Sequence, residues 1–583
     1  MKERVHLLFQ FADSVGQQSH MHFSDPYKVF VAETIEEVIP ALKKVQHAVA
    51  KGFYAAGYLS YEAAPAFDST FVTRNKGKMP LVWFGIFDQP DSEALPPTGG
   101  AFYISEWRPV ISAADYDNGI RAIKAAIEKG ITSQVNYTIR LNAKFSGDDV
   151  AFYEQLSRMQ TANYSAYLNI GRFRVLSASP ELFFHWDGEQ LVTRPMKGTM
   201  ARGRWLEEDR AQMTSLANSE KNRHENTMIV DLLREELASI AEAGSLNVPS
   251  LCEVERYPTV WQMTSTIVAR TRPDVTLLDI FSALFPCGSI TGTPKTKTMA
   301  LIADLETLPR EVYCGAIGFI RPSGEATFNV PIRTVVIDKQ EGIATYGTGG
   351  GITAASVAEE EYEEVQVKSA ILTEQYPDFA LLESLRLERG RYFLLDRHLD
   401  RLTQSAEYFG YNLLIKRVRA EMAAYAKQRS HAVEKVRLLV RKDGNFTIEG
   451  QSLTHLVSDP FVTLAMTPIS RENRFLYHKT THRVVYDAHR VQHPGVFDVL
   501  LWNEAGEITE FTTGNVVLEI QGEKWTPPRD SGLLAGTFRD HLIDQGEIRE
   551  RVLTKEDLTI CTTIWFINSV RGWVRVKFVE VSE

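Results

Sequence analysis

Charged side chains at helical spacing are the first features of the chain that could do chemistry. The segment NRHENTMIVDLLREELASIAEA (222–243) predicts an amphipathic helix that carries Glu225, and AEEEYEEVQVKSAILT (358–373) predicts a second helix. On the second helix Glu361 and Glu364 share one face, and Lys368 lies one turn further along that face. Carboxylates on two helices suit Mg²⁺, which takes one or two protein carboxylates, waters and an anionic substrate group. The same spacing also fits solvated charges near helix starts.

Two glycine-rich segments predict an anion site. PCGSITGTPKTK (286–297), which contains Thr291, combines small residues and hydroxyl groups with an expected helix start near Pro294. YGTGGGIT (346–353) is expected to form a second glycine loop that exposes backbone N–H groups. Together with Arg333 and Lys368, such loops suit a small dicarboxylate. Either loop alone is also typical of a tight turn.

The last third of the chain carries a different set of polar residues. A phosphate could be surrounded by Thr512, Thr513, Gly514, Thr537 and Arg401. A helix expected after Gly536 would add backbone N–H groups, Lys479 suits a Schiff base, and Glu510 suits a protonated ring nitrogen. Taken singly, these charged residues are also typical of an ordinary protein surface.

Two domains are expected to position these residues, because 583 residues exceed the usual size of one domain. The apolar patterns predict a helix over 116–130 that ends at a glycine, and strands over 135–145, 172–179 and 191–196. The pattern breaks near residues 376–378. We therefore expect a first domain over 1–375, with an N-terminal part (1–110) and a core (110–375), and a second domain over 379–583.

Composition excludes several classes of function. Hydrophobic residues make up 44% of the chain and the net charge is −10, with no long basic block, so a nucleic-acid partner is not expected. No apolar run of about 18 residues predicts a transmembrane helix, and the N-terminus resembles no secretion signal. The four cysteines show no CxxC spacing, which favours free thiols in a reducing compartment. We expect a cytoplasmic enzyme without a membrane partner.

Six blocks between residues 110 and 375 resemble the chorismate-binding enzyme family, in that family's order. They are SASPELFF (177–184), TRPMKGT (193–199), ENTMIVDLLREEL (225–237), GSITGTPK (288–295), IRT (332–334) and GTGGGIT…EEEYEEVQVK (347–368). The resemblance implies an α/β (α+β) sandwich of large, mostly antiparallel sheets. It further implies that Glu225 and Glu364 bind Mg²⁺, with Glu361 behind them. Chorismate would then be held by Thr291, Arg333, Gly349, Gly350 and Lys368.

Three positions distinguish members of this family. A lysine at the position of Lys197 resembles aminodeoxychorismate synthase, whereas anthranilate synthase has alanine there, and a desolvated lysine can act as a nucleophile. Isochorismate-type enzymes have a lysine that activates water where this chain has Gln134. Gln262 replaces a histidine that is tied to pyruvate elimination in anthranilate synthase. The resemblance thus implies amination of chorismate, with ammonia from a separate glutamine amidotransferase, because no glutaminase motif surrounds any cysteine.

The second domain resembles the fold-type IV pyridoxal-phosphate family, which includes aminodeoxychorismate lyase. The resemblance implies a smaller α/β domain and assigns cofactor contacts to Arg401, Lys479, Glu510, Thr513, Asn515 and Thr537. The two domains together would make 4-aminobenzoate for folate. Two alternatives stay open: an anthranilate synthase, and a synthase whose second domain is a non-catalytic module. The second alternative arises because almost nothing precedes LLESLRL (381–387) in that domain. The oligomeric state is not predicted.

Overall fold

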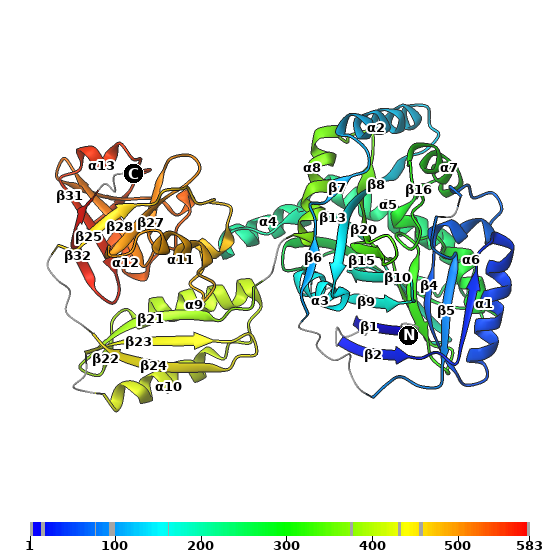
Figure 1. The fold of residues 1–583 in the computed structure, drawn as a ribbon, viewed down its shortest axis with the longest axis horizontal. Coiled ribbons are helices and arrows are strands. Elements are labelled where there is room, and N and C mark those ends of the chain that lie inside the picture. Colours follow the sequence, from blue (N-terminus) through cyan, green and yellow to red (C-terminus); the bar gives the residue numbers. More distant parts are fainter. Residues whose placement is uncertain are drawn as a thin grey trace. The chain divides into compact units, whose positions relative to one another are not determined.

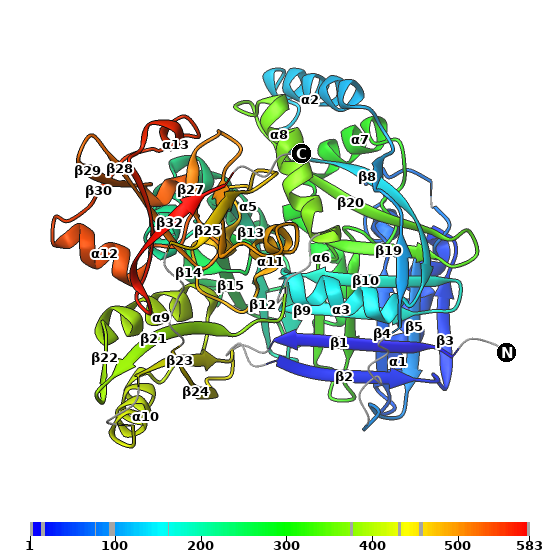
Figure 2. The same ribbon diagram turned by 60° about the vertical axis from the view of Figure 1, so that its left-hand side comes forward.

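The chain forms two compact units. The computed structural model describes residues 4–12, 18–75, 77–92, 100–160, 163–373, 377–429, 433–453 and 459–579. The first unit comprises Met1–Ala201 and Met213–Tyr376, and the second comprises Arg202–Gln212 and Pro377–Glu583. Figures 1 and 2 show the elements of each unit from two directions. Part of the predicted break near residues 376–378 falls on 374–376, which lie outside the described residues.

Two large sheets form the first unit. The first sheet contains β1 (His6–Ala12), β2 (Gln18–Ser24), β8 (Gln134–Gly147), β9 (Tyr164–Asn169), β10 (Phe173–Ser179), β16 (Gly292–Thr293), β19 (Thr334–Asp338) and β20 (Ile343–Ile352). The second contains β3 (Lys28–Ala32), β4 (Tyr54–Leu59), β5 (Val82–Phe87), β11 (Leu182–Trp186), β12 (Gln190–Arg194), β13 (Met196–Ala201), β14 (Asn247–Arg256), β15 (Val260–Arg270), β17 (Ala316–Ile320) and β18 (Ala326–Asn329). The strand orders are β16-β8-β20-β19-β10-β9-β1-β2 and β13-β15-β12-β11-β18-β17-β4-β5-β3. Neighbouring strands in both orders run antiparallel.

The inner faces of these two sheets share one apolar core. Phe9 of β1 and Leu168 of β9 belong to the same buried cluster as Tyr58 of β4 and Phe319 of β17. The rings of Phe9 and Phe319 meet edge to face with centroids 5.5 Å apart. Side chains of alternate residues point to opposite faces of a strand, so each sheet also has an outer apolar face that helices must cover. The expected sandwich of antiparallel sheets is therefore confirmed.

Helices cover both outer faces and carry the predicted charged residues. On the second sheet lie α1 (Ile35–Val49), α5 (Glu220–Ala238) and α6 (Leu277–Leu284), and on the first lie α2 (Ala113–Glu128), α3 (Asp149–Gln160) and α8 (Ala358–Ser369). The predicted helices over 222–243 and 358–373 are observed as α5 and α8. Gly130, with φ +67°, follows α2, as expected for a residue that ends a helix. The helix expected near Pro294 is α7 (Lys295–Leu305), with Pro294 as its N-cap.

One expected glycine loop is a strand instead. Gly347–Ile352 continue β20 and pair with β8, with Gly349 opposite Thr138 and Gly350 opposite Tyr137. The prediction of a loop was wrong because glycine also occurs inside strands, where a neighbouring backbone comes too close for a side chain. Here, a Cβ on Gly349 would lie 2.1 Å from the carbonyl oxygen of Tyr137. Close approach to β8 therefore accounts for this glycine.

The second unit combines an open sheet with a closed one. The open sheet has the order β22-β21-β23-β24 and consists of β21 (Leu381–Glu388), β22 (Arg391–Tyr392), β23 (Val433–Val440) and β24 (Phe446–Ser452). The other sheet includes β25 (Phe461–Leu464), β26 (Asp498–Trp502), β27 (Ile508–Phe511), β28 (Gly514–Ile520), β31 (Thr563–Asn568) and β32 (Gly572–Phe578). These six strands form a ring, because β27 pairs with both β26 and β28. The result is a barrel-like sheet.

The second unit also contains three helices that carry residues of its cavity. They are α9 (Leu395–Phe409), α11 (Val484–Val491) and α12 (Thr537–Asp544). The helix expected after Gly536 is α12, which confirms this prediction. Helix α4 (Leu206–Asn218) begins in the segment Arg202–Gln212. Among the described residues, no helix combines the length and the apolar character needed to cross a membrane.

Candidate active sites

A cavity of about 520 Å³ in the first unit gathers most of the predicted residues of that unit. Its lining includes Lys197, Glu225, Arg333, Gly349, Gly350, Glu361, Glu364 and Lys368. Thr291 does not line it, because this residue is fully buried and its hydroxyl donates to the carbonyl oxygens of Cys287 and Gly288. Gln134 lies just behind the lining and is 3% exposed. Helices α5 and α8 and strands β13 and β20 therefore bring distant segments to one place.

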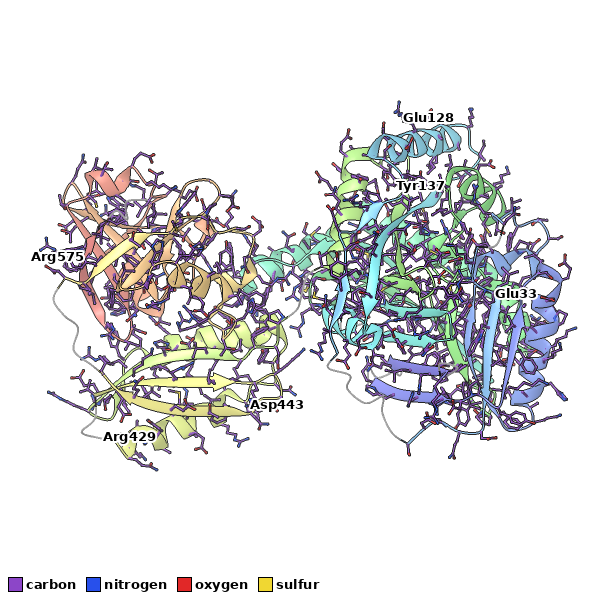
Figure 3. All side chains as sticks on the ribbon, viewed as in Figure 1. Glu33, Glu128, Tyr137, Arg429, Asp443 and Arg575 are labelled. Atoms are coloured by element: carbon purple, nitrogen blue, oxygen red, sulfur yellow. The ribbon has the colours of Figure 1, made fainter. Side chains whose placement is uncertain are left out.

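The glycines of β20 create room for the side chains of this cavity. A Cβ on Gly351 would lie 2.3 Å from Nζ of Lys197 and 2.3 Å from Nε2 of Gln134. A Cβ on Gly350 would lie 2.9 Å from a carboxylate oxygen of Glu361. Tyr137, which is labelled in Figure 3, marks the place on β8 that pairs with Gly350. The glycine run is thus explained by contacts with catalytic candidates on one side and with β8 on the other.

The backbone of β20 is also open toward the cavity. Strand β19 pairs with β20 only as far as Tyr346, so the following residues have β8 as their one strand neighbour in this sheet. The carbonyl oxygen of Gly349 accepts a hydrogen bond of 2.8 Å from Nζ of Lys368. Peptide groups of the glycine segment are therefore within reach of polar groups in the cavity, although they lie on a strand edge rather than on a loop.

Lys197 is partly buried, and its surroundings lower the pKa of its amine. Burial is the main reason that the pKa of Lys197 is lowered, and the positive charge of Lys368 lowers it further. The carboxylate of Glu225 acts in the opposite direction. A lowered pKa increases the fraction of the amine whose lone pair is available, which is what nucleophilic attack requires.

The residue after Lys197 is held by a side chain that replaces a family histidine. Nε2 of Gln262 donates to the carbonyl oxygen of Gly198 over 2.7 Å, and the hydroxyl of Thr199 donates to Oε1 of Gln262 over 2.9 Å. Gly198 has φ +96°, a conformation that favours glycine. Gln262 therefore holds the part of β13, at a shift of its register with β15, that presents Lys197.

The three predicted metal ligands lie around the same cavity. Burial and the neighbouring carboxylate of Glu364 raise the pKa of Glu361. Burial alone would raise the pKa of Glu364 too, but Lys368, whose Nζ is 2.8 Å from Oε1, lowers it overall. Among the described residues, no three acidic, histidine or cysteine side chains are close enough to bind a metal ion as they stand. Mg²⁺ needs only one or two protein carboxylates, so this set still fits that ion.

Glu181 lies within the block SASPELFF and is a further candidate, for which no role was predicted. It lines the cavity, is 2% exposed, and accepts a hydrogen bond of 2.6 Å from the hydroxyl of Ser289. Burial raises the pKa of Glu181 to about 7, so at neutral pH a large fraction carries a proton. A carboxyl group flanked by Pro180 and the apolar Leu182 is the sequence signal that could have identified it. Its position suits a proton donor.

A second cavity, of about 660 Å³, lies in the second unit. It is lined by all six residues predicted there for a cofactor: Arg401, Lys479, Glu510, Thr513, Asn515 and Thr537. Burial and the positive charge of Arg401 lower the pKa of Lys479 to about 8. Its amine is therefore much closer to neutrality than that of an exposed lysine.

Glu510 is oriented by three donors. The hydroxyl of Tyr486 donates to Oε1 over 2.8 Å, the backbone N–H of Leu534 donates to Oε1 over 3.1 Å, and Nδ2 of Asn515 donates to Oε2 over 3.3 Å. Burial raises the pKa of Glu510 to about 7. A carboxyl group held in this way can pair with a protonated ring nitrogen placed in the cavity. A role for Tyr486 was not predicted, because a tyrosine on an amphipathic helix has no distinctive sequence pattern.

Arg401 and Thr537 are connected through one buried carboxylate. Glu383 accepts two hydrogen bonds from Arg401, of 2.9 and 2.7 Å, and its Oε2 is 2.6 Å from Nδ1 of His398. The other ring nitrogen of His398 is 3.1 Å from the hydroxyl of Thr537. Burial would raise the pKa of Glu383, but Arg401 and His398 outweigh it and lower this pKa to about 2. Glu383 therefore stays ionised and holds both anion-binding candidates.

The side chain of Thr513 points to a different partner. Its hydroxyl donates to Oδ2 of Asp498, and the hydroxyl of Thr512 donates to Oδ1 of the same carboxylate. Thr513 can therefore offer a bound anion its backbone N–H rather than its hydroxyl. The N-terminus of α12, which begins at Thr537, adds further backbone N–H groups. A lysine, an oriented carboxyl group and an arginine beside a helix start form a donor set that fits pyridoxal phosphate.

Comparisons with known proteins match the chain to two families. Residues 7–374 match the family model of chorismate binding enzymes, and residues 380–579 match that of class IV amino-transferases. Aminodeoxychorismate synthase component 1 of Salmonella typhimurium is 39% identical over 269 residues, which are 46% of this chain and 59% of the relative. Anthranilate synthase component 1 of Methanothermobacter marburgensis is 31% identical over 341 residues, which are 54% of this chain and 73% of the relative.

A solved structure resembles the first unit in fold. The 2,3-dihydroxybenzoate-specific isochorismate synthase of Bacillus anthracis superposes with a TM-score of 0.52 at 21% identity, covering 63% of this chain and 95% of that one. At this identity the likeness concerns the fold alone. The family model, by contrast, matches well over half of the 583 residues. The chain therefore belongs to the chorismate-binding enzyme family and joins to it a domain of the class IV aminotransferase type.

Proposed function

We propose that the chain makes 4-aminobenzoate from chorismate in two steps. The first unit aminates chorismate to 4-amino-4-deoxychorismate, and the second eliminates pyruvate from this intermediate. The observation that carries the proposal is Lys197, a partly buried lysine with a lowered pKa that lies beside Gln134 in a cavity with three further cations, Lys221, Arg333 and Lys368. Since glutamine cannot deprotonate water, the lysine is the reactive group that the cavity offers. The relatives named aminodeoxychorismate synthase component 1 support this assignment.

In the first step, the neutral amine of Lys197 attacks ring carbon C2 of chorismate. The C4 hydroxyl leaves as water after it takes a proton from Glu181. Ammonia then attacks C4, the bond between C2 and Lys197 breaks, and the lysine is regenerated. Arg333 and Lys368 would bind the carboxylate of the enolpyruvyl group, because both are cations that line the cavity.

Glu225 and Glu364 are the residues that would hold Mg²⁺, with Glu361 behind them. The ion would neutralise the ring carboxylate of chorismate. Ammonia would come from a separate glutamine amidotransferase. The designation component 1 of the Salmonella typhimurium relative supports the expectation of a second component.

In the second step, Lys479 is the residue that attaches the cofactor and moves the proton. Pyridoxal phosphate, when bound, would act as an electron sink for a carbanion at C4 of the substrate. The free amine of Lys479 would remove the C4 proton of the substrate. It would return a proton to the enolpyruvyl group as the bond from C3 to the enolpyruvyl oxygen breaks and pyruvate leaves. Glu510 would pair with the ring nitrogen of the cofactor, and Arg401 would hold its phosphate.

Positive side chains around the second cavity support a substrate with two carboxylates. Besides Arg401 and Lys479, the lining contains Lys435, Arg437, Arg483, Arg490 and Arg571. The pKa of Lys435 is lowered by burial and by the neighbouring positive charges, chiefly that of Arg437. Cations that depress one another's pKa in this way are stabilised by a bound anion. An apolar amino acid would leave most of this charge uncompensated, whereas 4-amino-4-deoxychorismate carries two carboxylates.

The test is a product assay with the full chain. Chorismate, Mg²⁺ and ammonium are supplied with and without pyridoxal phosphate, and the products are separated by chromatography. We expect 4-aminobenzoate and pyruvate from the wild type, arrest at aminodeoxychorismate in Lys479→Ala, and only a small residual rate of amination in Lys197→Ala. Formation of 2-aminobenzoate would instead identify an anthranilate synthase. Arrest of the wild type at aminodeoxychorismate with cofactor present would show that the second unit is not a lyase.

The metal assignment is tested within the same assay. We expect a chelator to stop chorismate consumption and added Mg²⁺ to restore it. Glu225→Gln should raise the Mg²⁺ concentration that gives half-maximal rate by at least about tenfold, because it removes one of the few protein ligands. Glu235→Gln is the matched control, since Glu235 lies on the exposed face of the same helix. Equal Mg²⁺ dependence in both variants would rule out Glu225 as a ligand.

A further inference from the structure

The segment Arg202–Gln212, named the strap from here on, belongs to the second unit and contains a buried ion pair of its own. Nε and Nη2 of Arg202 bind the two carboxylate oxygens of Asp209 over 2.6 and 2.7 Å, and both side chains are 3% exposed. Asp209 also accepts the backbone N–H of Gly203 over 3.0 Å. A bidentate pair of this kind holds the strap in one conformation. The strap is therefore an ordered element of the structure.

Helix α9, which carries Arg401, forms one side of the strap's binding site. Nη2 of Arg202 donates to the carbonyl oxygen of Tyr408 over 2.9 Å, and the hydroxyl of Tyr408 donates to the carbonyl oxygen of Gly203 over 2.6 Å. The guanidinium of Arg202 also lies over the ring of Tyr408, 4.6 Å from its centroid. These reciprocal bonds satisfy backbone and side-chain groups on both partners.

The residues just before Lys479 form the other side. Trp205 packs against a buried cluster that includes Leu476, Tyr477 and Tyr486, and its ring centroid is 5.0 Å from that of Tyr477. The guanidinium of Arg204 donates to the hydroxyl of Tyr477 over 3.2 Å. Since Tyr486 in turn donates to Glu510, the cluster under Trp205 also contains a residue that orients the second site's carboxyl group.

His478 joins the strap to α9 directly beside Lys479. Its Nε2 is 3.2 Å from the carbonyl oxygen of Arg204, and its Nδ1 is 3.0 Å from the hydroxyl of Ser405. Burial lowers the pKa of His478 to about 3, so the ring is neutral. A carbonyl oxygen only accepts, and therefore Nε2 carries the proton and Nδ1 accepts from Ser405. The strap thus determines the tautomer and the orientation of the residue next to Lys479.

We propose that the strap positions Lys479, and that Arg204 and Trp205 are positioning residues for the second site. Both residues nevertheless lie within the part of the sequence that matches the chorismate-binding family. The inference rests on the proposed cofactor role of Lys479. It also predicts that a chain cut near residue 376 lacks an integral part of its second unit. The strap follows β13, which carries Lys197, and precedes α5, which carries Glu225.

Hydrogen exchange on the cofactor-free full chain tests the proposal without relying on catalysis. The backbone N–H of Leu382 donates to the carbonyl oxygen of Lys479 over 2.9 Å, and that of Tyr477 donates to Arg474. We expect Trp205→Ala to speed exchange of both amides at least about tenfold, because local opening becomes easier. Trp205→Phe keeps an aromatic ring on Tyr477 and should stay within about twofold of the wild type. Arg210→Ala, on the exposed face of the strap, is the matched control.

Cofactor titration provides the second measurement. Trp205→Ala should weaken the affinity for pyridoxal phosphate about tenfold or more, measured by the absorbance of the bound cofactor. Tyr408→Phe, which removes only the hydroxyl that donates to Gly203, should change affinity and exchange in the same direction by less, even if Trp205→Ala fails to fold. Wild-type exchange and affinity in Trp205→Ala would overturn the proposal. A wild type that binds no cofactor would contradict the proposed function instead, and the exchange rates would still decide the role of the strap.

Discussion

The amine of Lys197 lies where a side chain of Gly351 would begin. A Cβ on Gly351 would be 2.3 Å from Nζ, far closer than two such atoms can approach. Lys197 comes from β13 of the second sheet and Gly351 from β20 of the first. The space for the amine of Lys197, the proposed nucleophile, is therefore created by a missing side chain on the opposite sheet, and a single methyl group there should displace the amine.

Gly351→Ala should lower kcat/KM for chorismate about 100-fold, because a displacement of about 1 Å is enough to misalign a reacting group. Nε2 of Gln134 would also have to move, as it lies at the same distance from the added Cβ. Chorismate consumption with ammonium as the nitrogen source measures the effect.

A double-mutant cycle separates this cause from a general loss of stability. If Gly351→Ala acts through Lys197, its effect on the residual rate should largely disappear in a Lys197→Ala background. An undiminished effect in that background would show that the methyl group disturbs the cavity by another route. Thermal unfolding of each variant checks that the folded fraction is the same.

Glu181 predicts a specific dependence on pH. Its pKa is raised to about 7 by burial, and a proton donor is active only while protonated, so kcat/KM should fall as pH rises through about 7. Lys197 must be neutral, so its titration gives a limb that rises with pH, and the combination of the two limbs is a bell-shaped profile. Glu181→Gln should lower the rate about 100-fold or more and abolish the falling limb. A falling limb that persists in this variant would assign it to another group.

The contrast between Glu225 and Glu181 shows how far the sequence alone could predict the first site. Glu225 lies on a long amphipathic helix, and its position is encoded by a local period of 3.6 residues. The chemistry of Glu181 depends on burial and on Ser289, which is 108 residues away in the chain. No local pattern reports such a contact, so only the folded chain reveals the raised pKa.

The strand conformation of the glycine segment in β20 and the place of the strap in the second unit were not predicted, for a related reason. Gly349–Gly351 resemble a turn locally, and their real role is set by neighbours on β8, α8 and β13. The strap reads as a continuation of the first domain, yet Arg204 contacts His478 across 274 residues. Tertiary contacts override local signals in both cases, and both lie next to a candidate site. The two-sheet sandwich itself could be predicted because six blocks of the sequence resemble a known family.

Glu383 should contribute substantially to the stability of the second unit. Its pKa falls from 4.5 to about 2 on folding, which corresponds to about 3 kcal/mol at about 1.4 kcal/mol per pKa unit. Because the folded-state pKa is depressed, this contribution is present above pH 4.5 and is lost as pH falls toward 2. Glu383→Gln should therefore lower the free energy of unfolding at pH 7 by about 3 kcal/mol. Calorimetry of the unfolding transition of the second unit at pH 7 and pH 4 measures this loss of stability.

Glu388→Gln provides the matched control on the same strand. Glu388 pairs with Arg386, but these side chains are 41% and 36% exposed, so the pair should contribute no more than about 1 kcal/mol. Equal losses in the two variants would contradict the view that Glu383 anchors Arg401 and His398. Glu383→Gln should in addition weaken the binding of inorganic phosphate to the cofactor-free chain, since Arg401 loses its partner.

Lys479 should control the rate at which the cofactor attaches, with a midpoint near pH 8. Only the neutral amine adds to an aldehyde, and burial together with Arg401 lowers the pKa of Lys479 to about 8. The attachment rate, followed by absorbance after rapid mixing, should rise with pH up to about 8 and then level off, and Lys479→Ala should show no attachment. Glu383 raises the pKa of Lys479, so Glu383→Gln should move the midpoint to lower pH. A midpoint near the ordinary value of 10.5 would mean that this lysine is solvated, and an unchanged midpoint in Glu383→Gln would mean that the two charges do not interact.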